Sequence, residues 1–158
     1  SALVAARCAF SSDHEAAALR LDECEAAATQ LHLADAAAHC LGLRGLAAQL
    51  RGDLAEAESY LEVALRELAD VGETAEWLMA SFEYAVVLSL DGRSAEASAV
   101  STSALAVCRQ RGERWARSYL KWSQGLDTGC KATSPRHMRP RSTRFVITAS
   151  SIRPWAPP

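Results

Sequence analysis

Apolar side chains recur every three or four residues along most of the chain, a pattern typical of amphipathic helices. The clearest stripe consists of Leu54, Ala57, Leu61, Ala64, Leu65 and Leu68. This periodicity predicts helices over residues 2–10, 13–31, 34–50, 54–70, 74–90, 94–110 and 113–126. Only residues 145–149 alternate as a strand would, and they have no partner strand, so we expect an all-α fold.

Glycines separate these predicted helices at a constant spacing. Gly52, Gly72, Gly92 and Gly112 each follow the one before by twenty positions, and no proline interrupts the segments between them. Glycine tolerates positive φ and therefore commonly ends a helix or forms the turn to the next one. The spacing predicts helices of about 16–18 residues, each about 25 Å long, joined by short turns.

The segments that begin at Gly52 and Gly92 are near-copies, so the full repeat covers two of these glycine intervals. In both segments, the glycine is followed by two variable residues and then by Ala-Glu-Ala, and the segment ends at Gly-Glu. One period earlier, Ser12 takes the place of the glycine. A single helical hairpin cannot bury its apolar face alone, whereas stacked hairpins share a continuous core.

Small residues at fixed positions make the chain resemble the tetratricopeptide class over about residues 1–126. The matching positions are Gly45, Gly52, Ala57, Leu61 and Ala64 in one repeat and Ala85, Gly92, Ala97 and Ala104 in the next, with Gly72 and Gly112 at further turns. The resemblance implies a right-handed superhelical stack of antiparallel helix hairpins. The chain departs from the class in its period of about forty, against about 34, and in the polar Ser101 at a large apolar position.

Residues 107–126 carry a narrower resemblance. The run Cys-Arg-x-x-Gly-Glu-Arg-Trp-Ala-Arg-Ser-Tyr is similar to the helical-repeat region of large ATP-binding LuxR-type transcriptional regulators of actinobacteria, and the 15 arginines against 2 lysines fit that coding bias. The resemblance implies a non-catalytic middle segment between an ATPase and a helix-turn-helix domain. The chain shows no phosphate-binding GxxxxGK[ST] motif, and its uncapped apolar start suggests that it begins inside a longer protein.

By the tetratricopeptide pattern, the first helix of each hairpin lines the inner face of the stack. The inner positions are Phe10, His39, Leu46, Gln49, Met79, Phe82, Val86, Tyr119 and Trp122. Of these, we expect Met79, Phe82, Val86, Tyr119 and Trp122 to form an interaction groove for a peptide or helix. The alternative is that they belong to the core between helices or are covered by neighbouring repeats. Trp77 and Trp115 are interpreted as packing anchors.

Charge and proline divide the chain near Gly129. Residues 1–129 contain all 19 acidic residues and 11 basic ones, a net charge of −8, whereas residues 130–158 have six basic residues, no acid and all five prolines. We therefore expect a helical-repeat domain over 1–129 that makes no direct nucleic acid contact, followed by a basic tail over 130–158. The tail is a phosphate-binding arm, a disordered linker or a non-native extension from a shifted reading frame.

No residue pattern points to catalysis, a metal or a cofactor. The four histidines lie outside HExxH and CxxC contexts, and no GxSxG accompanies the serines. Five cysteines without a CxxC pair suggest reduced thiols in a cytoplasmic protein, and no apolar run reaches the roughly 18 residues of a membrane span. The expected partner is a protein or peptide, or the neighbouring domains of the same regulator. The alternatives are a free-standing adaptor and an all-helical enzyme.

Overall fold

The computed structural model describes the backbone of residues 13–133 and the side chains up to residue 125. This part of the chain is all-helical, as predicted. Its helices are α2 (His14–Gln30), α3 (Ala34–Arg51), α4 (Leu54–Val71), α5 (Ala75–Leu90), α6 (Ser94–Arg111) and α7 (Arg114–Thr133). All but the last match the predicted ranges closely, with bounds that differ by no more than a single position. The predicted helix over 2–10 and the possible strand over 145–149 lie outside the described residues.

The last helix is longer than predicted. It continues from Arg114 through Gly129 to Thr133, so the first residues of the expected basic tail are helical. The division of the chain near Gly129 stays a prediction from composition. No helix within residues 13–133 is both long and apolar enough to cross a lipid bilayer.

Two helices begin on aspartates at equivalent positions, one full period apart. The Asp13 carboxylate accepts a hydrogen bond from the backbone N–H of Ala16 at 3.1 Å, and Asp53 accepts one from Glu56 at 3.0 Å. Such caps satisfy N–H groups that have no partner inside the helix. The third copy of this position is Arg93, which caps nothing with its side chain. Its guanidinium instead pairs with Glu58 of α4, as well as with Glu96 in the first turn of α6.

The turns follow the constant glycine spacing. Gly52, Gly72, Gly92 and Gly112 all have positive φ, between 70° and 118°. One interval before Gly52, His32 has φ 53° and is the one non-glycine residue with positive φ among those described. The backbone geometry of the turn therefore recurs there without glycine, which explains why the glycine spacing alone did not reveal that turn.

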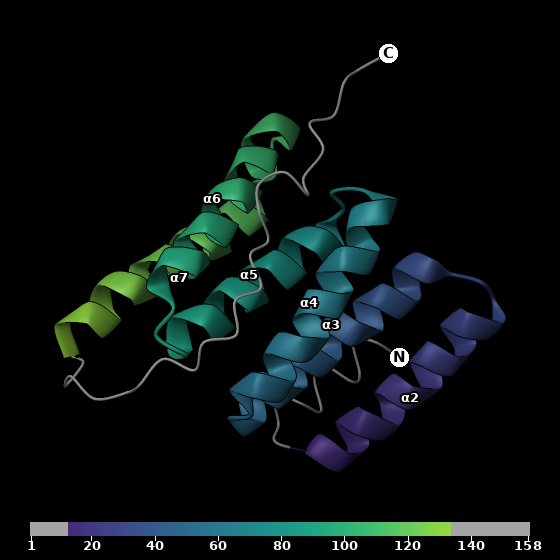
Figure 1. Ribbon diagram of the computed structural model, residues 1–158. Helices are drawn as coiled ribbons and strands as arrows, with labels where there is room; N and C mark the ends of the chain where they lie inside the picture. The colour runs from purple at the N-terminus through teal and green to yellow at the C-terminus, as the bar shows by residue number, and fades with distance from the viewer. Residues whose placement is uncertain (1–12, 134–158) are drawn as a thin grey trace.

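Each helix packs against the next one along the chain, and α5 also contacts α3 and α7. Thus α3, α5 and α7 form a row, whereas α2, α4 and α6 make no such contact with one another within the described residues. Figure 1 shows the helices following each other from α2 at one end to α6 and α7 at the other. Because α5 has neighbours on several sides, residues 80–89 are all buried.

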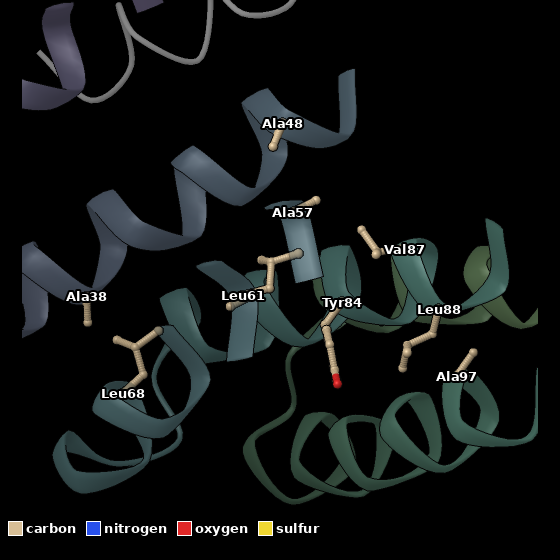
Figure 2. Close-up of a cluster of buried hydrophobic side chains, with 10 residues drawn as sticks. Ala38, Ala48, Ala57, Leu61, Leu68, Tyr84, Val87, Leu88 and Ala97 are labelled. Atoms are coloured by element: carbon tan, nitrogen blue, oxygen red, sulfur yellow. The ribbon is translucent and has the colours of Figure 1, made fainter. Parts of the chain in front are cut away.

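Small side chains let the helix axes approach closely in the main core. Figure 2 shows this cluster, in which alanines from α3, α4 and α6 surround Leu61, Tyr84 and Leu88. The helices are tightly packed at Gly45, because a Cβ atom placed there would lie 2.5 Å from the Cγ atom of Leu61. The repeat positions Ala57, Leu61, Ala64, Ala85, Ala97 and Ala104 are all buried.

Within residues 13–133, each of the three junctions between one hairpin and the next (α2–α3, α4–α5 and α6–α7) contains a polar pair with the same separation along the sequence. The pairs are Asp22 with Arg44 at 2.5 Å, Glu62 with the Tyr84 hydroxyl at 2.9 Å, and Ser101 with Ser123 at 3.1 Å. The last pair accounts for the polar residue that interrupts the apolar stripe of α6. Ser101 is buried where α4 has Leu61, and the Ser123 hydroxyl supplies its hydrogen-bond partner.

Candidate interaction surface

Four aromatic side chains meet where α5 lies beside α7. The ring of Phe82 contacts Tyr119 edge-on with centroids 5.3 Å apart and lies 6.0 Å from the ring of Trp122. Trp115 in turn contacts Tyr119 edge-on at 6.3 Å. These spacings suit favourable aromatic pairs. We call Phe82, Trp115, Tyr119 and Trp122 the aromatic face.

The α7 side chains of the aromatic face are exposed to solvent, whereas its α5 side chain is buried. Phe82 is 9% exposed, whereas Trp115, Tyr119 and Trp122 are 39%, 51% and 56% exposed. The three α7 residues follow one another at i, i+4 and i+7, so they form a second apolar stripe on that helix. The first stripe, Ala116, Leu120 and Ser123, is buried against the rest of the molecule. Helix α7 therefore presents large apolar side chains that no described residue covers.

Helix α7 also carries exposed positive charge on another side. Arg114, Arg117 and Lys121 are exposed on α7 and make no ion pair within the described part of the chain. No acidic residue occurs from 114 to 125. The surface of α7 thus combines aromatic and basic groups, in contrast to the acid-rich helices α2 and α4.

The predicted groove residues fall into two environments. Tyr119 and Trp122 are exposed, whereas Phe82 and Val86 are buried in a cluster with Leu105 and Leu120, and Met79 packs partly buried against it. The structure therefore brings Phe82 together with Tyr119 and Trp122, but it places Val86 within the core between helices. Trp77 packs against both large buried clusters, in keeping with its interpretation as a packing anchor, whereas Trp115 is exposed.

Other predicted inner-face residues gather in a cleft between α3 and α5. Three of them, His39, Leu46 and Met79, line this cleft, which we call the acidic cleft. Its other lining residues are Gly42, Leu43, Leu68, Glu76, Ala80 and Glu83. About 20 Å³ of it is open to the centre of a water molecule, which is room for about one water. Gln49 is half-buried nearby on α3, and Phe10 lies outside the described residues.

Glu83 is the most unusual residue of the acidic cleft. It is 8% exposed, and its carboxyl group has no hydrogen bond or ion pair to any described residue. Burial raises the pKa of the Glu83 carboxyl from 4.5 to about 7, because desolvation penalises the charged form. The sequence contained a signal for it, since Glu83 is the single charge within the apolar run from Trp77 to Leu90.

The thiols of Cys24 and Cys40 lie within hydrogen-bond distance of each other, with Glu25 and Arg44 nearby. No three His, Cys, Asp or Glu side chains among the described residues are grouped so as to hold a metal ion. Cys40 and Cys108 are buried free thiols and Cys24 is half-buried. Desolvation raises the pKa values of Cys40 and Cys108, which disfavours the reactive thiolate.

Comparisons of the chain with family models, curated proteins and solved structures found no match. The resemblances to the tetratricopeptide class and to LuxR-type regulators therefore rest on the residues that carry them in the sequence. The structure adds the arrangement of the helices and the location of the two surfaces described above.

Proposed function

We propose that this chain is a non-catalytic interaction segment built from helical repeats. Its architecture is proposed to be a tetratricopeptide-like right-handed superhelix whose period is longer than that of the class. Support comes from the row of α3, α5 and α7, from the caps at Asp13 and Asp53, and from the polar pairs at the three junctions. In such a stack the first helix of each hairpin is available to a partner.

The aromatic face is the observation that carries the proposal. Large exposed aromatic side chains are enriched where proteins bind one another, because they bury much apolar area with little loss of conformational freedom. Tyr119 and Trp122 are both more than half exposed and rest against the buried Phe82 ring, which holds them in place. A partner that covers them would remove a contiguous apolar surface from water.

We further propose that the parent protein is a bacterial transcriptional regulator of the LuxR type with a linked ATPase. The support is the resemblance of residues 107–126, which form the end of α6 and most of α7 and include the exposed aromatic residues. Binding along the stack would then bias the attached ATPase or DNA-binding domain. The coding sequence on either side tests this, since an upstream phosphate-binding loop and a downstream helix-turn-helix are expected. Their absence from both sides would favour the adaptor instead.

A binding experiment tests the surface itself. The 158-residue chain is titrated with the purified domains encoded on either side, and binding is measured by calorimetry. Tyr119→Ala and Trp122→Ala should each weaken binding by about tenfold or more, with far-ultraviolet circular dichroism unchanged. Glu67→Ala, an exposed change on α4, is the matched control and should bind normally. Wild-type affinity in both aromatic variants would refute the assignment of the surface.

A further inference from the structure

Glu83 presents an electrostatic problem that the described residues do not resolve. A carboxylate removed from water loses its hydration and needs a hydrogen-bond donor or a cation in return. Glu83 as a whole residue is 8% exposed and has neither among the described residues, so the only relief for its carboxyl oxygens is the little solvent that reaches them through the cleft. The other ionisable groups lining the same cleft are Glu76 on α5 and His39 on α3, so the cleft contains two carboxyl groups and no arginine or lysine.

Elsewhere in the molecule, acidic groups at helix junctions are paired. Arg44 reaches Asp22 and Glu25 across the α2–α3 junction, and Arg93 reaches Glu58 on α4. Both arginines are themselves largely covered, and each carries its charge between two helices. The row formed by α3 and α5 has a buried acid at a comparable place but no arginine. A guanidinium from outside the described residues would complete the same arrangement.

We propose that the acidic cleft is a binding site for a guanidinium group, the head of an arginine side chain supplied by a partner protein. A guanidinium is planar, presents several N–H donors to a carboxylate and is more weakly hydrated than an ammonium. It therefore enters an apolar cleft at a lower cost than lysine does. Leu43, Leu46 and Met79 line the same cleft as Glu83 and are apolar, which suits the methylene stem of an arginine.

The size of the cleft limits what can enter. The space open to a water molecule is about 20 Å³, room for about one water, so one edge of a planar guanidinium can replace that water while the rest of the group stays at the mouth of the cleft, and a larger small-molecule ligand is excluded. This site lies between α3 and α5, and its ligand is a cationic head group. The exposed aromatic side chains of α7 are not part of it, so the guanidinium site stands whether or not the aromatic face has a partner.

A small probe tests the site without knowledge of the partner. Ethylguanidinium chloride, at millimolar concentrations, is titrated into the isotopically labelled 158-residue chain. The Glu83 carboxyl carbon and the Gly42 amide, both in the cleft, are followed by nuclear magnetic resonance. We expect saturable shifts at both positions and a fall of at least one unit in the pKa of Glu83. Ethylurea, which has nearly the same shape without the charge, should produce no saturable shift.

Two variants and a second cation complete the test. Glu83→Gln should abolish saturable binding. The variant should still fold, because the change removes a buried charge. Since it lacks the Glu83 carboxyl carbon, its binding is followed by the shift of the Gly42 amide alone. Glu67→Gln, on the exposed side of α4, should bind ethylguanidinium as the wild type does. n-Butylammonium should bind several-fold more weakly. Equal binding by Glu83→Gln, equal shifts with ethylurea, or no saturable binding by the wild type would each overturn the proposal, and tighter binding of the ammonium would overturn the choice of arginine.

Discussion

Leu61 on α4 occupies the space that a side chain on Gly45 of α3 would need. A Cβ atom at Gly45 would lie 2.5 Å from Leu61 Cγ, closer than real Cβ contacts come. Leu61 is itself completely buried, so it has little room to move away. The contact sets how closely α3 and α4 approach and joins a glycine and a leucine that both match the tetratricopeptide pattern.

Gly45→Ala should therefore destabilise the protein even though alanine is the better helix former. Overpacking a buried contact costs about 1–3 kcal/mol, which exceeds the gain of about 1 kcal/mol in helix propensity. Gly42, earlier on α3, is the matched control, because a Cβ there would meet its nearest neighbour, Ala80 Cβ, at an ordinary 4.0 Å. Gly42→Ala should stabilise the protein slightly. Urea unfolding of both variants measures the difference, and a more stable Gly45→Ala variant would contradict the close contact.

Glu83 should make stability depend on pH in a definite direction. In the unfolded chain its carboxyl group ionises near 4.5, whereas burial in the folded protein holds its pKa at about 7. The folded state therefore keeps a proton that the unfolded state loses. The contribution of Glu83 to stability is fully present below pH 4.5 and is lost as pH rises to about 7, a loss of about 3 kcal/mol.

The comparison with Glu83→Gln isolates this contribution from those of the other ionisable groups, which the variant and the wild type share. The free energy of unfolding is measured by urea titration at several pH values from 4.5 to 8. The free energy of unfolding of Glu83→Gln, relative to that of the wild type, should increase as pH rises and should level off above pH 7. A difference that stays constant with pH would show that Glu83 does not titrate in this interval.

The two sides of the aromatic face should respond differently to truncation. Phe82→Ala should lower stability by about 3 kcal/mol, because its ring is buried among Leu105 and Leu120 and its removal leaves a cavity. Trp122→Ala should cost less than about 1 kcal/mol, since that side chain is mostly exposed and loses chiefly its contact with the Phe82 ring. Thermal unfolding of the two variants measures both effects. Similar losses of stability would mean that Trp122 is part of the core.

The helices and most of their turns could be predicted because they depend on local features of the sequence. Periodic apolar positions define the helices, and glycine at positive φ defines four of the turns. The turn at His32 was predicted as the gap between the helices over 13–31 and 34–50, although its backbone has positive φ without the usual glycine. The extension of α7 past residue 126 was missed because Gly129, a poor helix former, lies within it.

The surfaces were harder to predict because they depend on which helices become neighbours. The pattern of the first helices placed His39, Leu46 and Met79 on one inner face, and they do line one cleft. It did not separate the buried Phe82 from the exposed Trp122, because burial here is decided by how closely α5 and α7 pack. Nor did it predict the role of Arg93, which occupies the N-cap position of α6 but pairs its side chain with Glu58 and Glu96.

The polar pairs at the hairpin junctions have a consequence for how the chain avoids assembling wrongly. Near-identical repeats risk docking on the wrong neighbour or exchanging between molecules. Here one junction uses an ion pair, the next a tyrosine with a carboxylate, and the third two serines. A hairpin seated out of place would form different polar pairs, and one that set Ser101 against Arg44 would leave that arginine without an acid, so the three junctions are not interchangeable.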